Sequence, residues 1–494
     1  MTIKTTFALA LTAAVGLAAC DGTTNKATPE RLEALRTEGI NPDRRAKEDQ
    51  RFANTLARAN SIAEVNADFG QSAVDNPANA ALPDLLQNAL ERNTDIGRAA
   101  QNINRADAER LNAIFGYLPQ VSANFTRTQV RSRVISSDNA VFQLGTATYG
   151  VTTMGATVTQ PLVNVSRIFA IQTATTARTI AEVRYIAAVQ KAIFDTTDTY
   201  LAAAASKMRM QEYQTRGASL GRQAATEMGL ADSGLASDQA RRALLSEQGQ
   251  VQSDYALEAA NYAQLLGRLS ALTGTAISGV GAVSAPGGIS GTEGRMSVAQ
   301  AVALAEKNNP EILAIAMSVV EADLARKGAM AADFGPVVDA FANIERETRG
   351  GSRFGGGSKT QEMTAGVQVT IPLFNARGDG LRTLNANVDL RSAVVDYHAT
   401  RRELETRIAM TLERMKQLST ASGQLSQAYR AAQANVQSER DLVASGQSND
   451  LVLAARQRLA SQLQVQAEVQ RVEYLRAWNE LQYLTGALNT NALR

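Results

Sequence analysis

Two kinds of hydrophobic pattern follow one another along this chain, and each occurs twice. Between residues 363 and 371 apolar side chains alternate with small or polar ones, and residues 121–126 show the same period of two. This period predicts β-strands that have one apolar and one polar face. The apolar positions are Val121, Ala123 and Phe125 in the first run, and Met363, Ala365, Val367, Val369 and Ile371 in the second.

The second pattern has a period of three to four and predicts very long helices. It runs from Val165 to Met228 and from Ala376 to Val443, with no proline in either stretch. At ~1.5 Å per residue, about 65 residues form a rod on the order of 100 Å long, far longer than a compact domain needs. In the second rod the stripe comprises Leu404, Ile408, Leu412, Met415, Leu418, Leu425, Tyr429, Val436 and Val443.

Shorter segments complete each unit. A helical stretch is expected at 82–115 and again at 297–333, where Ser297 is a candidate N-cap. Each rod should reach a turn, at 229–237 or 445–449, and return through a second helix that ends at Leu-Thr-Gly.

These elements recur in one order with a constant separation. The segment VTQPLVN at 158–164 matches VTIPLFN at 369–375, and the stop at 272–274 matches that at 484–486. Pro161 and Pro372 are 211 positions apart, and Gly274 and Gly486 are 212 apart. Chance would not keep order and spacing together. The sequence therefore predicts structural repeats at 82–274 and 297–486, a Gly-rich flexible linker at 275–296 and a tail at 487–494.

Each repeat thus contributes two strands, joined through turn-rich loops at 136–145 and 350–359. In a soluble sandwich their apolar face would cover a core, whereas in an outer-membrane barrel it would meet lipid and the polar face would line a lumen. Four strands cannot close a barrel, and lipid does not tolerate open edges. If the strands enter a membrane, several chains must share one barrel.

The N-terminus has the pattern of an export signal at residues 1–19. Lys4 is followed by an apolar run from Phe7 to Leu17, too short to span a bilayer, and then by Leu-Ala-Ala-Cys. Cys20 is the single cysteine of the sequence, and its context resembles the bacterial lipobox, which predicts lipid attachment there. Asp21 directly follows this cysteine. In enteric bacteria an aspartate at that position favours retention of a lipoprotein in the inner membrane. Residues 20–81 are expected to be a polar leash, helical in part from Asp43 to Val65.

Composition argues against several other functions. The chain has 50 basic and 48 acidic residues, so no basic face indicates a nucleic-acid partner. With one histidine, His398, no His-based metal site or catalytic triad can form within a protomer. Gly355 to Thr360 is expected to be a loop and not a phosphate site, because a strand follows it. Trp478 is expected to anchor packing. The chain is therefore predicted to be no enzyme, with no catalytic residues, metal or cofactor.

From residue 82 to 486, the repeated strand exits, helix turns and Leu-Thr-Gly stops resemble those of the TolC-type outer-membrane efflux family, and the lipobox resembles its lipoprotein branch. The resemblance implies a mixed α+β membrane protein. Three copies would each give four strands to a transmembrane β-barrel, and their long helical hairpins would form a periplasmic α-barrel.

The same resemblance implies a passive efflux duct. Such a homotrimer would be lipid-anchored in the outer membrane, reach into the periplasm, and work with a periplasmic adaptor and a proton-driven or ABC-type inner-membrane pump. Its cargo would be small toxic compounds or, in type I secretion, polypeptides. The alternative is a non-conducting periplasmic scaffold lipoprotein built from helical hairpins.

The resemblance also implies functional residues at the two turns. Asp238 and Asp450 occupy equivalent positions, and a trimer would repeat each of them around one axis as an acidic aperture or gate. Both could instead be N-caps of the returning helices. The adaptor-contacting positions would be Gly234, Ser237, Gly446 and Asn449. Residues 452–455 hold no second acidic residue.

Overall fold

The computed structural model describes residues 79–135, 145–232, 238–283, 296–352, 355–372 and 380–488. All of them belong to one unit, from Phe69 to Arg494. The predicted signal, Cys20, Asp21 and the expected leash helix at 43–65 lie outside the described residues. No helix in the described ranges is both long enough and apolar enough to cross a membrane.

The four predicted strands form one antiparallel sheet in the order β1-β2-β3-β4. The first repeat supplies β1 (Gln120–Val134) and β2 (Gly145–Asn164), and the second supplies β3 (Val337–Arg349) and β4 (Ser358–Thr370). The repeats therefore join through β2 and β3. Strands β1 and β4 are the edges of the sheet, and each pairs with one neighbour among the described strands. The expected Gly-rich loop ends earlier than residue 359, because β4 begins at Ser358.

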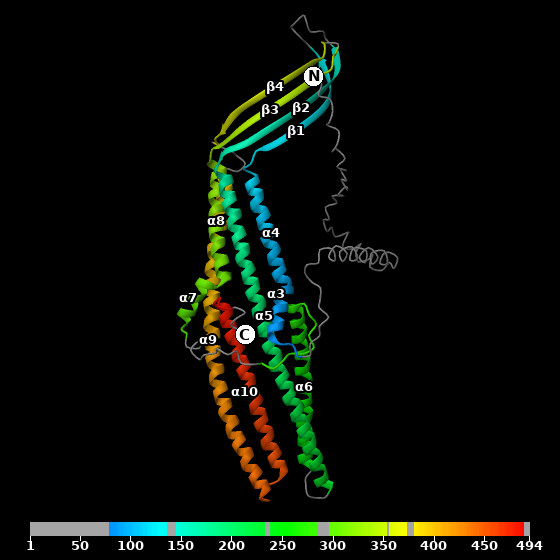
Figure 1. Cartoon of the computed structure of the whole chain (residues 1–494), viewed down its shortest axis with the longest axis vertical. Coiled ribbons are helices and arrows are strands. Elements are labelled where there is room, and N and C mark those ends of the chain that lie inside the picture. Colours follow the sequence, from blue (N-terminus) through cyan, green and yellow to red (C-terminus); the bar gives the residue numbers. More distant parts are fainter. Residues whose placement is uncertain are drawn as a thin grey trace, which may run out of the picture. The chain divides into compact units, whose positions relative to one another are not determined.

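The long rods and their returning helices are confirmed (Figure 1). They are α5 (Val165–Asp232) with α6 (Asp238–Thr273), and α9 (Leu381–Ala444) with α10 (Asp450–Leu484). Helix α5 follows β2 directly at Val165, so the strand passes into the rod without a loop. Two predicted boundaries were wrong. Gly229 lies within α5 and not in the turn, and α9 begins at Leu381, after Gly380 with a φ of +76°.

Each expected opening helix is in fact two helices, interrupted at an asparagine. In the first repeat these are α3 (Leu82–Arg92) and α4 (Thr94–Phe115), and in the second α7 (Val298–Asn308) and α8 (Pro310–Phe334). Ser297 caps α7 as predicted, in a capping box with Gln300. The sequence signal that was missed is Asn309-Pro310, because proline favours an extended residue before it and the first position of a new helix.

Asn93 and Asn309 form equivalent hydrogen bonds in the two repeats. The Oδ1 of Asn309 accepts hydrogen bonds from the amides of Glu311 (2.8 Å) and Ile312 (3.3 Å), and its Nδ2 donates to the Leu484 carbonyl oxygen at 2.9 Å. Asn93 caps α4 in the same way and donates to the Leu272 carbonyl oxygen at 3.2 Å. Each repeat thus fastens its opening helices to its Leu-Thr-Gly stop, so the repeated sequence motif corresponds to a repeated contact.

Replacing Asn309 with alanine should lower the free energy of unfolding by about 2–3 kcal/mol. The change removes a helix cap, worth about 1 kcal/mol, and leaves the Leu484 carbonyl without its buried donor, which costs a similar amount or more. Urea unfolding followed by circular dichroism would measure the effect. The control is Ser297→Ala, which removes an exposed cap alone and should cost about 1 kcal/mol. Equal losses in the two variants would contradict the role of the Leu484 bond.

Two core clusters hold the helices together, and α10 contributes to both. The first includes Tyr200, Leu201, Leu269, Val472 and Leu475. The second includes Ile312, Leu404, Ile408, Met415, Trp478 and Leu481. Trp478 is buried, as predicted for a packing anchor. The last helix therefore ties the second repeat to the first.

The expectation of a flexible linker was wrong for its first part, residues 275–283. Ile277 and Val280 are buried in the first core cluster, and Val280 forms a parallel bridge with Ala80. Because apolar side chains recur within this Gly-rich stretch, burial fixes it against the helices. Residues 284–295 lie outside the described residues.

Candidate functional site

One face of the sheet is apolar and exposed over the half that lies next to the helices. The strand register places Val121, Val158, Ala342 and Ala365 side by side, and in the next row Ala123, Ala156, Ile344 and Met363. Several of these side chains are largely open, with Val121 72% and Met363 77% exposed. The predicted alternation is confirmed, and no described part of this chain covers the apolar face.

The opposite face is polar and acidic. The register places Asp339, Glu345, Glu347 and Glu362 on this face, with Glu345 directly opposite Glu362. Thr157 donates to the Asn343 side chain at 2.9 Å across β2 and β3, as residues on one face can. Arg349 is the one basic residue on this face of the four strands, and it pairs with Glu347. In the half next to the helices, the sheet therefore presents apolar groups on one side, and the other side of the sheet carries negative charge.

The turn between α9 and α10 is built by a left-handed glycine. Gly446 has a φ of +75°, and the amide of Gln447 donates to the Leu442 carbonyl at 2.9 Å, as in a Schellman motif. Asn449 then caps α10, its side chain accepting from the Val452 amide at 3.1 Å. Gly446 and Asn449 are both exposed in this chain.

The two candidate gate residues occupy equivalent backbone positions, since Asp238 and Asp450 are the first residues of α6 and α10. The alternative interpretation of Asp450 as an N-cap was wrong, because Asn449 fills that position. The Asp450 side chain is exposed and free of capping, although its charge still favours a helix N-terminus. Gly234, Ser237 and the side chain of Asp238 lie outside what the structure describes.

Behind the second turn lie polar contacts that sequence reasoning missed. Glu439, which is buried, accepts a hydrogen bond from Ser448 and lies 4.0 Å from the Arg456 Nε. Two residues further along α10, Arg458 donates to the Gln223 side chain on α5 at 2.9 Å. The two residues are 235 positions apart in the sequence, and their bond links the hairpins of the two repeats. No local sequence pattern signals such a contact.

A hollow of about 440 Å³ opens beside this turn. Glu227 of α5 borders it on one side, and on the other lie residues of the cap and first turns of α10. The apolar part of this lining is Leu451, Val452, Ala455 and Leu459. The hairpin tip thus offers an apolar surface with one acidic and one basic side chain, Glu227 and Arg456, next to the candidate gate residues.

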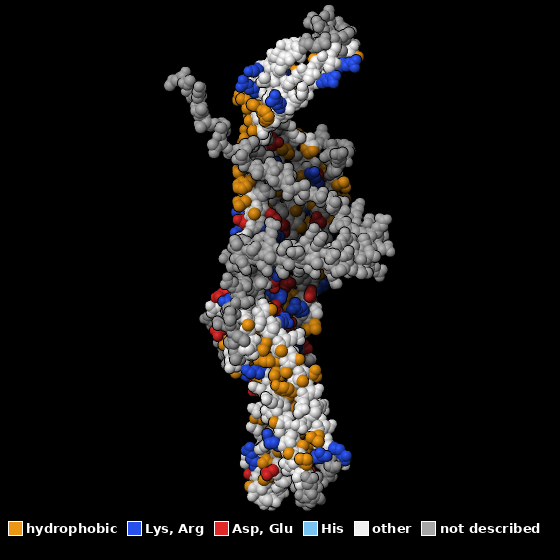
Figure 2. Space-filling view, turned by 90° about the vertical axis from the view of Figure 1, so that its right-hand side faces the viewer, with side chains coloured by type: hydrophobic (Ala, Val, Ile, Leu, Met, Phe, Trp, Pro, Cys, Tyr) orange, Lys and Arg blue, Asp and Glu red, His pale blue; other side chains and the backbone are white. Residues whose placement is uncertain are grey.

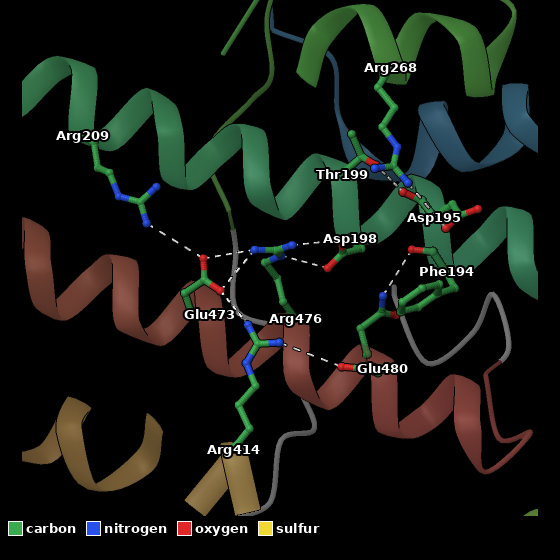
Figure 3. A network of polar contacts seen from close by, with 11 residues as sticks. Phe194, Asp195, Asp198, Thr199, Arg209, Arg268, Arg414, Glu473, Arg476 and Glu480 are labelled. Atoms are coloured by element: carbon green, nitrogen blue, oxygen red, sulfur yellow. Dashed lines mark hydrogen bonds and ion pairs between the residues drawn. The ribbon is translucent and has the colours of Figure 1, made fainter. Parts of the chain in front are cut away.

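Nearer the middle of the helices, a charged network joins α5, α6, α9 and α10 (Figure 3). Arg476 lies at its centre and donates to Asp198 at 2.8 and 3.0 Å and to Glu473 at 3.1 Å. Glu473 also pairs with Arg414 at 3.1 Å. Burial alone lowers the pKa of Arg476, but the hydrogen bonds and charges of Asp198 and Glu473 outweigh it, so that pKa lies above its ordinary value. The network fixes the packing of the two repeats.

A second cavity, of about 410 Å³, lies between the hairpins, and its lining is largely charged or polar. Glu212 in its wall is 8% exposed, and desolvation by burial raises the pKa of its carboxyl, although Arg216 opposes the shift. No cluster of three or more His, Cys, Asp or Glu suited to a metal occurs among the described residues. His398 is exposed on α9 beside Tyr397.

Comparison with known proteins points to outer-membrane channels. Residues 301–487 match the family model described as outer membrane efflux protein. No curated protein matches the chain. Among solved structures, the Campylobacter jejuni CmeC outer membrane channel is similar with a TM-score of 0.67 at 14% identity, covering 85% of this chain and 93% of that one.

Two further structures agree. VceC, an outer membrane protein of Vibrio cholerae, gives a TM-score of 0.62 at 16% identity over 82% of this chain and 96% of its own. The open-state MtrE outer membrane channel of Neisseria gonorrhoeae gives 0.61 at 18% identity over 83% and 90%. Identities this low establish the fold, and the match at 301–487 establishes the family of that segment. The second repeat thus matches the outer membrane efflux protein family, and the chain as a whole has the fold of the outer-membrane channels.

Proposed function

We propose that this protein is the passive outer-membrane exit duct of a tripartite export system, and that it works as a homotrimer. One observation carries the proposal: a four-stranded sheet with an exposed apolar face and two open edges continues directly into helices of up to 68 residues. In lipid the backbone groups of an open edge must find partners. Edge strand β4 of one copy can pair with β1 of the next, so three copies of four strands would close a twelve-stranded barrel.

In this arrangement the two faces of the sheet have separate tasks. The apolar face would meet lipid, and the acidic face with Glu345 and Glu362 would line the lumen. The hairpins would surround a periplasmic tunnel that ends at the turns, where an adaptor would contact Gly446, Asn449, Gly234 and Ser237. We propose small toxic compounds as the cargo, supplied by an inner-membrane pump, and lipid attachment at Cys20. Secreted polypeptides are the second cargo class.

Purified full-length protein tests the duct directly. We expect a heat-modifiable trimer in outer-membrane fractions that conducts ions in planar bilayers. A soluble, non-conducting rod would overturn the proposal and support the periplasmic scaffold lipoprotein instead. Export is then tested by deleting the gene and measuring both drug susceptibility and the secreted proteins, since only the first should change.

At the aperture, Asp238→Asn combined with Asp450→Asn should raise conductance or alter the preference for cations. Two aspartates in each of three chains would place six carboxylates near one axis, and a ring of negative charge attracts cations. Reversal potentials across asymmetric salt would measure the change. Asp389→Asn with Asp396→Asn, exposed positions on α9 away from the turn, removes the same charge as a control. Identical conductance and ion selectivity in wild type and the aperture variant would contradict the gate. The two aspartates would then only stabilise the N-termini of their helices.

A further inference from the structure

Beyond the apolar band, the same face of the sheet becomes basic. On β1 the alternation that places Val121, Ala123 and Phe125 on this face continues to Arg127, Arg131 and Arg133. The register adds Arg346, opposite Met154, and Lys359, in the row of Arg127. All five side chains are exposed. They lie toward the strand ends that are farthest from the helices, and Lys and Arg side chains are visible on the sheet in Figure 2.

Nothing described in this chain neutralises these charges. No acidic residue of the four strands lies on this face, because Asp339, Glu345, Glu347 and Glu362 all lie on the other. None of the five forms an ion pair within the described part of the chain. Basic groups that a protein leaves unpaired on one side of a sheet suit an anionic partner outside the protein.

The spacing suits the surface of a lipid leaflet. Along β4 the apolar positions from Met363 to Val369 span about 20 Å at ~3.4 Å per residue, which fits within the ~25 Å apolar band of membrane barrels. Arg127 follows Phe125 by one step on the same face, and Arg133 lies a further ~20 Å along β1. The charges are therefore spread in a strip, which suits a row of head groups better than a single small anion.

We propose that this basic strip, formed by Arg127, Arg131, Arg133, Arg346 and Lys359, binds the phosphate groups of membrane lipids in the leaflet at the far ends of the strands. The inference rests on the proposed function, because it requires the sheet to lie in the membrane. Arginine and lysine both carry a positive charge that attracts phosphate, and three of the five residues lie on β1, so these three together should contribute most. The strip would fix the depth of the barrel and strengthen the trimer where its loops meet the outer surface.

Native mass spectrometry of the detergent-purified trimer, titrated with bis-phosphorylated lipid A, tests this proposal. Wild type should retain the lipid, and the triple variant R127Q/R131Q/R133Q should bind it on the order of 100-fold more weakly, since each basic residue near an anionic surface contributes about a fivefold factor. The triple variant R127K/R131K/R133K should keep most of the binding. A matched control, R382Q/R391Q/R430Q, removes the same charge from exposed positions on α9 and should bind as wild type does.

Several results would overturn the lipid site. These are equal retention by the glutamine triple and wild type, equal retention of uncharged diacylglycerol, and displacement of lipid A by millimolar inorganic phosphate. Each variant is first checked for the heat-modifiable trimer. If the glutamine triple does not assemble, the comparison of lipid A with diacylglycerol and the competition with inorganic phosphate on wild type keep the test decisive. Wild-type conductance is measured on the same samples. Its absence refutes the duct, whereas unaltered lipid retention in a conducting glutamine triple refutes the strip alone.

Discussion

Replacing Gly486 with alanine is expected to lower the free energy of unfolding by on the order of 4 kcal/mol, the largest loss predicted for a single methyl group in this chain. Gly486 has a φ of +69°, which by itself costs an L-residue about 1–2 kcal/mol. A Cβ there would also lie 2.4 Å from the Asn308 carbonyl oxygen and 2.7 Å from the Asn309 nitrogen. Both are backbone atoms, so relief requires moving the junction of α7 and α8 and weakening the bond from Asn309 to Leu484.

The chain supplies its own controls for this prediction. Gly446 has nearly the same φ, +75°, but a Cβ there meets nothing within 4 Å, so Gly446→Ala should show the strain alone, about 1–2 kcal/mol. Gly274, the equivalent of Gly486 in the first repeat, would place its Cβ 3.1 Å from the Arg92 Cβ and should be intermediate. Urea unfolding of the three variants measures the series. If Gly486→Ala lost no more stability than Gly446→Ala, the close approach to α7 would have no energetic weight.

Arg476→Gln is expected to cost about 3 kcal/mol. The change removes a guanidinium whose side chain is 25% exposed and leaves Asp198 and Glu473, 27% and 18% exposed, without their shared partner. Breaking a buried pair on one side costs about 3–5 kcal/mol, and the partial exposure places this case near the lower end. The Arg414 guanidinium still reaches Glu473, so we expect α5 to separate from α10 more readily than α9 does.

Arg471→Gln on the same helix is the matched control. Arg471 pairs with Glu468 at 3.0 Å, but their side chains are 41% and 49% exposed, so its loss should change stability by about 0.5 kcal/mol or less. Combining Arg476→Gln with Asp198→Asn should recover part of the loss, because the second change removes one of the stranded charges. Equal thermal stability of the Arg476 and Arg471 variants would argue that the network contributes nothing beyond surface pairing.

Much of the fold could be predicted from the sequence because its evidence is local or repeated. The alternation of residues 363–371 specifies a strand wherever that strand pairs, and about 65 residues without proline specify a rod whatever surrounds them. The constant separation of Pro161 from Pro372 identifies two copies without any knowledge of their packing. Helix ends were less certain. Helix α9 begins at Leu381 and not at Ala376. Gly380, the residue before its first position, has a φ of +76°, which is not a helical value.

The candidate site was predictable in position but not in mechanism. Equivalence placed Asp238 and Asp450 at the starts of two helices, yet it could not show that Asn449 supplies the cap. Asparagines 93 and 309 escaped notice because a single asparagine inside an apolar period has little weight until its partner, the Leu-Thr-Gly stop, is brought beside it. Arg476 was not singled out because its partner Asp198 lies 278 positions away.

The sequence by itself determined that this chain has two copies of a strand pair and a long helical hairpin, because periodicity and spacing are properties of neighbouring residues. Only the tertiary structure decided that β2 and β3 join the copies, that α10 contributes to both core clusters, and that acidic and basic residues lie on opposite faces of one sheet. Those outcomes depend on register and on contacts between distant residues. A shift of one residue in any strand would move every one of its side chains to the other face, and with them the separation of charge.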